Sequence, residues 1–561
     1  MGIRTTKESA LFAARQGAGD RTSHRVAHRV VVGVLTGLVA TAYCGFALVQ
    51  YDTFQTSSYD LVIFDQAVRS YAHFKPGISV IKGVHNGFGP HFSVLGDHFS
   101  PIIAVLAPLY WIYAGPQTLL VAQAVLFALA IPPLWLFTRR AFGGGPKAVA
   151  AAYLVAVAYA LSWPIASALA FDFHEVAFVP VLTAVALERL QAGRLRSALI
   201  ALGALLLVKE DMGLFVAGIG LYLAVSRPVV SRQRLVAAAL VICGLLASFI
   251  AIYVLIPVFG GRSGYYWAYT DLGRNLPQAA WHLVTHPGSS LQLLITPHVK
   301  LDTMLWLVGA FCFLPLLSPI TLAALPLLLE RMLGNVFQAW WVTSLQYNAY
   351  LVVILLCAAV DGAARLDRWL LARQHLAAQR ENAPEAGTSA EPTHEAAQPE
   401  AKPSAAVPPA AARGQWTVGL ACAAALCAAA LVLVPRFAFG LALHSSFYHR
   451  NAQERAAAAA DAVIPVGVTV QAADNLGPQL SARDTVLLWD GDGSTPPLGS
   501  PWVVANTRKL QFTFRSVREQ RQRVALLEDS GYQVVFARDG YLVLHRGGPA
   551  TGPASSSKET G

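Results

Sequence analysis

The stretch VVGVLTGLVATAYCGFALVQ, residues 31–50, decides the fold class because it is almost wholly apolar. A helix of this length rises about 30 Å, which matches the hydrocarbon core of a bilayer. Arg15, Arg21, Arg25 and Arg29 precede the run. The apolar run is too long for the core of a cleaved signal peptide. It therefore predicts a membrane anchor, preceded by a basic N-terminal segment, residues 1–30, that stays in the cytoplasm.

Similar apolar runs recur along the whole chain. The composition agrees, since 55% of the 561 residues are hydrophobic and only 13% are charged, against about 25% charged residues in soluble domains. The pattern predicts a polytopic α-helical membrane protein with about 11 transmembrane helices, several of them short. The expected spans are residues 31–50, 117–137, 147–168, 176–190, 197–208, 213–225, 235–258, 301–317, 321–333, 342–360 and 416–434.

The basic residues indicate orientation rather than a nucleic-acid partner. The net charge is +10, but Lys and Arg fall in short connections between apolar runs, as the positive-inside rule describes. If residues 101–114 form an interfacial helix and do not cross the membrane, the basic connections fall on every second link between spans, all on the cytoplasmic side. The predicted location is the bacterial plasma membrane, with the loop 51–116 outside. All six cysteines lie in apolar segments, so neither disulfides nor thiolate metal sites are expected.

Composition divides the rest of the chain. Residues 31–380 form the expected transmembrane domain, and residues 381–413, rich in Ala, Pro and Glu, form a disordered cytoplasmic linker. A last transmembrane helix, 414–437, precedes an extracytoplasmic α/β domain, 438–546, and a disordered tail, 547–561. Short apolar runs predict strands at residues 468–472, 486–489, 502–505, 534–537 and 541–544, around a helix at 515–529. Asp539-Gly540 predicts a tight hairpin.

Carboxylates and a histidine gather in the first expected outer loop. Asp65 lies a few residues after the first span, with Asp60 as a second carboxylate. Such groups bind divalent cations or take a proton from a hydroxyl, although from this loop alone a helix cap or a solvated loop position is the favoured explanation of Asp65. Asp97 precedes His98 and a proline-led segment. Helix capping accounts for Asp97 but not for His98.

Three further polar groups fall on the same expected face. Asp172 and His174, in the turn FDFHE at residues 171–175, are candidate ligands for Mg²⁺ or Mn²⁺, or simply charges that keep the turn in water. Lys209 interrupts an apolar region and could hold a lipid phosphate as a point charge, or be neutralised by a neighbouring carboxylate. The substrate- and phosphate-binding candidates are Lys209, Glu210, Asp211, Arg262, Asp97 and His98. For the loop of Arg262 an interfacial aromatic belt is the favoured interpretation.

In this order the motifs resemble the bacterial membrane-protein family known as domain of unknown function 2079. The resemblance rests on Phe64-Asp65-Gln66, on residues 97–101, 171–174 and 209–213, and extends to residues 474–478 and 531–544. That family is similar to the GT-C glycosyltransferases, polytopic enzymes that transfer a sugar from a polyprenyl-phosphate carrier to an acceptor outside the membrane.

The resemblance implies a GT-C-like fold and roles for the candidate residues. Asp65, or less favourably Asp60, would act as general base in an inverting transfer, and Lys209 with Arg262 would steady the departing phosphate. Asp172, His174 and Asp97 would position a metal, Mg²⁺ or Mn²⁺, or the acceptor. Such enzymes carry an acidic pair where this chain has Asp65-Gln66. The implied partners are a lipid-linked sugar donor, a cell-envelope acceptor and membrane lipids, with no nucleic acid.

Two other classes of function fit the same residues. Buried Lys, Glu, Asp and His also form ion paths in transporters and lipid flippases. No internal repeat is visible and the charges gather at one face, which favours the enzyme. A non-catalytic cell-envelope assembly protein is the third alternative.

Overall fold

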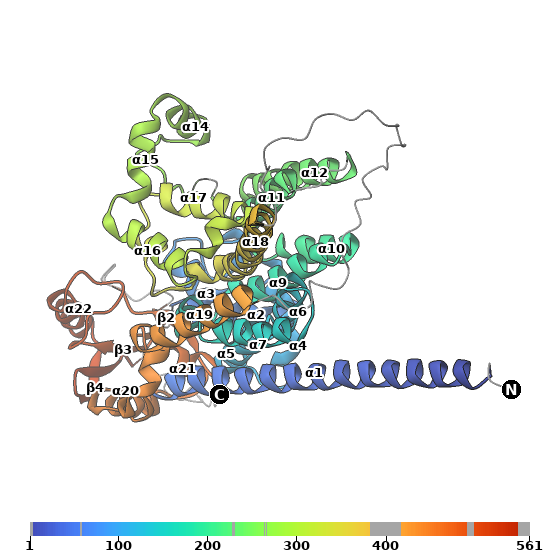
Figure 1. The fold of residues 1–561 in the computed structure, drawn as a ribbon. Helices are drawn as coiled ribbons and strands as arrows, with labels where there is room; N and C mark the ends of the chain where they lie inside the picture. Colours follow the sequence, from blue (N-terminus) through green and yellow to red (C-terminus); the bar gives the residue numbers. More distant parts are fainter. Residues whose placement is uncertain are drawn as a thin grey trace, which may run out of the picture.

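The chain folds into a bundle of helices with a small mixed β-sheet at one end, as a computed structural model shows (Figure 1). The structure describes residues 4–56, 59–226, 231–262, 264, 266–381, 417–490 and 499–547. The expected linker, except Glu381, and the expected tail, except Gly547, lie outside the described residues.

The helices of the bundle follow the apolar runs. Their bounds are α1 Arg4–Asp52, α2 Tyr59–Ala72, α3 Val80–His85, α4 Ala107–Tyr110, α5 Pro116–Ala128, α6 Ile131–Ala141, α7 Pro146–Ala160, α8 Trp163–Ala170, α9 Phe178–Gln191, α10 Leu195–Leu205, α11 Met212–Val225, α12 Ser231–Ile250, α13 Ile256–Val258, α14 Leu276–Thr285, α15 Pro287–Ile295, α16 His298–Gly309, α17 Leu325–Leu333, α18 Ala349–Glu381 and α19 Thr417–Leu433.

Six helical segments among the described residues are long and apolar enough to cross a membrane. They are Val26–Asp52, Pro116–Ala141, Pro146–Ala170, Gln233–Val258, Gln346–Gln374 and Val418–Arg436. Other expected spans occur as shorter apolar helices, such as α10 and α11. The expected count of about 11 crossings is therefore not confirmed by helix length. Residues 101–114, expected not to cross, contain only short helical turns and α4.

Helix α18 is the centre of the bundle. Its first three turns, residues 349–360, are buried throughout, as expected for a helix that is apolar on all sides. Beside it, α11 and α12 pack unusually closely. A Cβ placed on Gly213 would lie 2.2 Å from the carbonyl oxygen of Gly244, so small residues allow the two backbones to touch.

The sheet belongs to the C-terminal part of the chain. Its strands are β1 Thr469–Ala472, β2 Thr485–Leu488, β3 Trp502–Asn506, β4 Gln533–Arg538 and β5 Tyr541–His545, and its helices are α20 Ala452–Val463, α21 Gly477–Ser481 and α22 Val517–Asp529. The order is β2-β1-β3-β5-β4. β1 pairs in parallel with β2 and β3, whereas β5 is antiparallel to β3 and β4. The expected hairpin forms at Asp539 and Gly540, which both have positive φ.

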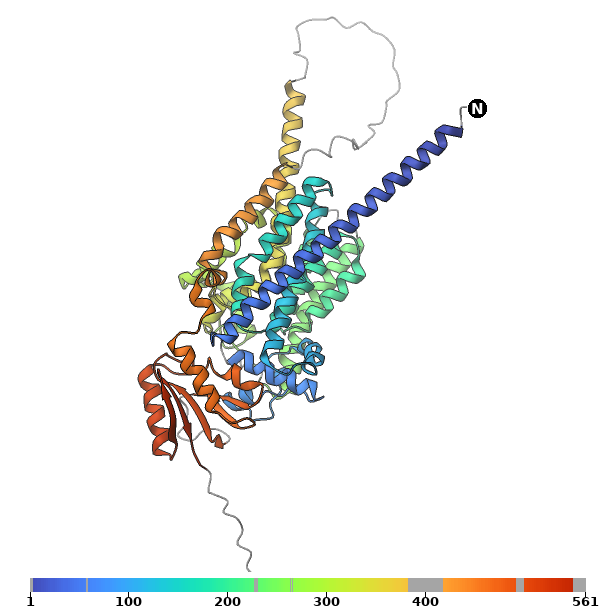
Figure 2. The ribbon, with the colours of Figure 1, turned by 90° about the horizontal axis from the view of Figure 1, so that it is seen from below.

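The sheet and the far ends of α1 and α18 lie at opposite ends of the bundle (Figure 2). We call the end with the sheet the sheet end. One face of the sheet joins the main hydrophobic core through Val470, Val486 and Val543. The other face packs Trp489 and Phe514 under α22. Thus the first loop, residues 53–115 between α1 and α5, lies between the helices and the sheet.

Candidate functional site

A cavity of about 1140 Å³ lies beneath the first loop. One part of its wall is charged and aromatic, and the rest is apolar. The charged residues on the wall are Asp60, Lys82, His85, Asp97, His98, His174, Glu175, Lys209, Glu210, Asp211, Arg262, Glu330 and Arg331. The apolar wall comes mainly from α12 and its continuation, through Leu245, Leu246, Phe249, Ile252 and Ile256, and from α14, through Leu276, Ala279, Ala280 and Leu283. The cavity therefore suits an amphipathic ligand.

Lys209 lies in the turn between α10 and α11 and pairs with Glu175. Its Nζ is 3.1 Å from Glu175 Oε1, and the Glu175 side chain is only 1% exposed. Burial raises the pKa of Glu175, but the charge of Lys209 and of nearby histidines brings it below its usual range. The other carboxylate oxygen, Oε2, is buried without a hydrogen-bond partner. An oxygen in this position can accept a hydrogen bond from a ligand in the cavity.

Glu210, next to Lys209, holds the first loop through His98. His98 Nδ1 is 2.7 Å from Glu210 Oε1, and the backbone N–H of Phe99 donates to Oε2 over 3.1 Å. Burial raises the pKa of Glu210, but His98, its hydrogen bond and Lys209 lower it to about 2. The His98 ring stacks on Tyr266 at 4.7 Å. This contact orients the His98 ring toward Glu210 at the cavity wall.

Lys82 is a member of the site that the sequence analysis missed. Its Nζ lies 3.0 Å from Asp97 Oδ2 and 3.1 Å from the hydroxyl of Tyr266, which itself donates to Asp97 Oδ1 over 2.5 Å. Lys82 is nine-tenths buried in a glycine-rich loop. The sequence around Lys82 has no periodicity or motif that predicts a role for it. Its partners come from other parts of the chain and become visible only in the structure.

Asp60 reaches the cavity together with His174. The two atoms His174 Nε2 and Asp60 Oδ2 are 3.4 Å apart. Burial raises the pKa of Asp60, but His174 and Lys82 lower it below its usual range. His174 Nδ1 is buried without a hydrogen-bond partner. The Gln123 side chain orients this turn, because it donates to the carbonyl of Asp172 and accepts from the N–H of His174.

Asp65, the favoured catalytic candidate, does not line the cavity. It is fully buried, 3.0 Å from Arg69 and bonded at 2.7 Å by the Tyr110 hydroxyl. Arg69 also donates to the carbonyl of Ser481, and the Gln66 amide donates to the carbonyl of Val486. The Asp65-Gln66 motif therefore ties α2 to the sheet, which corrects the expectation that Asp65 faces a substrate.

The proposed metal ligands do not form a complete donor set. Asp172 is buried, has a φ of 49° and is not on the cavity wall, whereas His174 faces Asp60. Among the residues that the structure describes, no three His, Cys, Asp or Glu side chains converge as metal ligands. Mg²⁺ and Mn²⁺ sites need several oxygen ligands. The geometry therefore does not fit the expected Asp172–His174 metal site, and no step below uses one.

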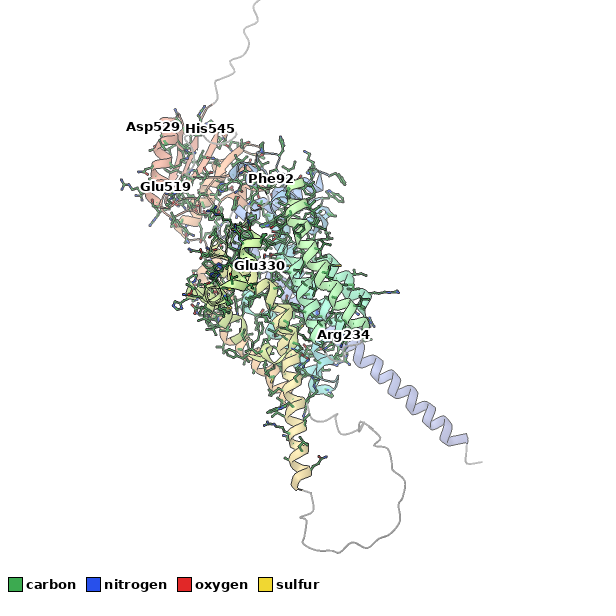
Figure 3. The ribbon with its side chains drawn as sticks, turned by 90° about the horizontal axis from the view of Figure 1, so that it is seen from above. Phe92, Arg234, Glu330, Glu519, Asp529 and His545 are labelled. Carbon is green, nitrogen blue, oxygen red and sulfur yellow. The ribbon has the colours of Figure 1, made fainter. Side chains whose placement is uncertain are left out.

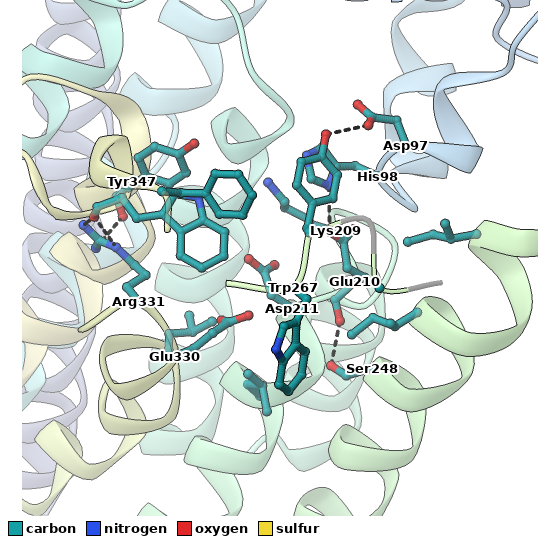
Figure 4. A pocket seen from close by; sticks show the side chains of 18 of the residues that line it. Asp97, His98, Lys209, Glu210, Asp211, Ser248, Trp267, Glu330, Arg331 and Tyr347 are labelled. Atoms are coloured by element: carbon teal, nitrogen blue, oxygen red, sulfur yellow. Dashed lines mark hydrogen bonds and ion pairs between the residues drawn. The ribbon is translucent and has the colours of Figure 1, made fainter. Parts of the chain in front are cut away.

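The far wall of the cavity contains Glu330 and Arg331 of α17, which the sequence analysis did not select. Figure 4 shows them opposite Lys209, Glu210 and Asp211. Arg331 is held by the carbonyls of residues 340 and 347 and by the Asn348 side chain. The sequence does contain an indication of their role, because two charged residues inside the apolar run 321–333 are unusual.

Asp211 and Glu330 place two further carboxyl groups on the cavity wall. Burial is the main reason that the pKa of Asp211 is raised to about 7, and the negative charges of Glu210 and Glu175 add to this rise against the opposing charge of Lys209. Arg262, by contrast, is an exposed residue of the cavity rim, with its guanidinium 5.4 Å from the centre of the Phe88 ring. The structure thus brings together all the substrate-binding candidates named from the sequence, but with many of their charges already paired.

The fold and the cavity define a polytopic membrane protein with a charged and apolar pocket next to a small sheet. Residues 50–381, more than half of the chain, match the family described as "Predicted membrane protein (DUF2079)". The protein belongs to this family. No protein of curated function matches the chain.

Solved structures of low sequence identity resemble the fold. ArnT from Cupriavidus metallidurans bound to undecaprenyl phosphate is 14% identical with a TM-score of 0.46, and the match covers 93% of this chain and 99% of that chain. The apo state of the same protein gives a TM-score of 0.42 at 14% identity, covering 91% and 98%. The archaeal oligosaccharyltransferase AglB from Archaeoglobus fulgidus, in complex with an inhibitory peptide and a dolichol-phosphate, gives 0.29 at 11% identity, covering 84% and 69%.

Proposed function

We propose that the protein is a membrane glycosyltransferase that moves a sugar from a polyprenyl-phosphate donor to a cell-envelope acceptor. The observation that carries this proposal is a cavity whose charged end continues into an apolar wall. A lipid-linked sugar has the same division into a polar head and a long apolar chain. Binding sites are generally apolar with a few placed polar groups.

The donor fits with its chain along α12 and α14 and its phosphate near Lys209. An ammonium group has three N–H donors, so the pair with Glu175 leaves Lys209 able to bind a phosphate oxygen. Arg262 at the rim supplies a second cation. Phosphate gains negative charge as the bond to the sugar breaks, so a cation placed there stabilises the transition state more than the ground state.

Asp60 is the residue that we propose as general base. It lines the cavity, and its lowered pKa keeps it ionised at neutral pH. The acceptor hydroxyl would attack the anomeric carbon from the face opposite the phosphate and give its proton to Asp60, while the polyprenyl phosphate leaves with the bonding electrons. His174, 3.4 Å from Asp60, orients the carboxylate.

Transfer in nanodiscs tests this proposal. The full chain is supplied with radiolabelled sugars on polyprenyl phosphate and with cell-envelope fractions, and Asp60→Asn is the comparison variant. We expect labelled acceptor from the wild type and a loss of about 100-fold or more in the variant, with donor binding retained. A folded wild-type protein that transfers nothing from any donor would contradict the proposal and favour transport.

A further inference from the structure

Two aromatic side chains from distant parts of the sequence meet at the wall of the cavity. Tyr59, the first residue of α2, and Phe512, in the segment between β3 and α22, both line the cavity. Their ring centres are 5.9 Å apart at an interplanar angle of 28°. Phe512 is nevertheless 68% exposed. The sheet end therefore presents an open aromatic surface to the cavity.

The exposure of Phe512 is built into its segment, because the residues on either side are anchored. Gln511 is buried, its side-chain oxygen accepts from the N–H of Asp474, and its own N–H donates to Gln520. Phe514 is buried against Trp489 at 4.5 Å. A rigid segment holds Phe512 outward although burial of a phenylalanine side chain lowers the free energy. A ligand that covers the ring would recover that free energy.

Polar groups border the same surface. The Tyr59 hydroxyl donates to Asn86 Oδ1 over 2.7 Å, and His85 Nδ1 lies 3.4 Å from Asp490 Oδ2. Asp490 Oδ1 is buried without a hydrogen-bond partner. Aromatic faces carry negative charge density that attracts the polarised C–H groups of a ring. A flat apolar surface beside polar acceptors is the chemistry that a saccharide requires, because sugars carry C–H groups on a face and hydroxyls around the edge.

We propose that Tyr59 and Phe512 form an acceptor subsite that stacks a saccharide ring. This inference rests on the proposed function and deepens it, since it names the acceptor as a glycan and gives the sheet a part in binding. Tyr59 directly precedes Asp60. A sugar stacked on Tyr59 is thus adjacent to the carboxylate that would take the proton from its hydroxyl.

Saccharide binding, measured in the absence of the lipid-linked sugar donor, tests the subsite separately from sugar transfer. The full chain in nanodiscs is titrated with a panel of hexose, hexosamine, pentose and uronic-acid oligosaccharides, with saturation-transfer NMR as the readout. We expect at least one saccharide to bind the wild type, Phe512→Ala to weaken it by about 10-fold, and Phe512→Trp to retain it. Phe74→Ala is the control, because Phe74 is an exposed phenylalanine that does not line the cavity.

Each outcome has a separate meaning. Loss of binding only in Phe512→Ala supports the subsite. Equal binding by Phe512→Ala and the wild type, or no binding across the panel, would overturn it. Because no donor is present, a failure of sugar transfer in the nanodisc assay leaves this result unchanged and counts against the proposed function alone.

Discussion

Asp60 and Asp65 occupy the same helix but have different surroundings. Five residues along an α-helix turn a side chain by about 140°, so the two carboxylates point to different sides of α2. Asp60 faces the cavity and His174. Asp65 faces Arg69, Tyr110 and the sheet. Asp60 is therefore open to a ligand in the cavity, whereas Asp65 is enclosed by structural contacts.

We expect Asp65→Asn to act mainly on stability. The carboxylate is fully buried and paired with Arg69, and removal of one partner of a buried pair costs about 3 kcal/mol or more. The measurement is the unfolding temperature in nanodiscs, which we expect to fall, together with faster proteolysis of the sheet. Asp60→Asn is the matched variant, five residues away and in contact with the cavity. An unchanged unfolding temperature for Asp65→Asn would refute this assignment.

Asp211 predicts a pH dependence of stability. Its folded-state pKa, about 7, is raised above the model-compound value of 3.8. As pH rises, the unfolded chain therefore loses this proton at a lower pH than the folded chain does. The contribution of Asp211 to the free energy of unfolding thus falls between about pH 4 and about pH 7 and stays low above pH 7. We expect Asp211→Asn to raise the unfolding temperature relative to the wild type at pH 8 but much less at pH 4. An equal difference in unfolding temperature between Asp211→Asn and the wild type at pH 4 and pH 8 would argue against a raised pKa of Asp211.

At the scale of elements, the close packing of α11 and α12 positions the Lys209 turn. Gly213 is the second residue of α11, two positions after Asp211, and a Cβ placed on it would collide with the carbonyl oxygen of Gly244. We expect Gly213→Ala to push the helices apart at a cost of about 1 to 3 kcal/mol and to weaken donor binding. Gly203→Ala is the control, since a Cβ there meets nothing within 4 Å. The Kd for a polyprenyl phosphate measures the effect, and equal values for both variants would contradict it.

The sequence predicted the helices and the hairpin better than it predicted the contacts between them. Apolar runs located the long helices because the bilayer sets their length, and Asp539-Gly540 located a hairpin because both residues tolerate positive φ. The Lys209 turn was visible because charge there interrupts apolar sequence. Lys82 and Glu330 were not found, since their roles depend on neighbours distant in the chain.

At the scale of the whole molecule, the two ends of the bundle differ in charge and structure. Figure 3 shows Arg234 at the end from which α1 projects, Phe92 near the sheet, and Glu330 between them. Arg139 and Arg140 end α6, and basic residues are also present where α9 and α10 connect. The positive-inside rule places such an end in the cytoplasm. The sheet end and the mouth of the cavity would then face outward.

Single cysteines at the two ends test this orientation. We expect a membrane-impermeant maleimide to label Asp529→Cys, on α22, in intact cells, and to label Arg368→Cys, on α18, only after the cells are lysed. Both side chains are exposed, so reactivity depends on sidedness. The wild type measures the background from the native cysteines. Labelling of Arg368→Cys in intact cells with a silent Asp529→Cys would reverse the orientation, and the cavity would then receive its donor and acceptor from the cytoplasm.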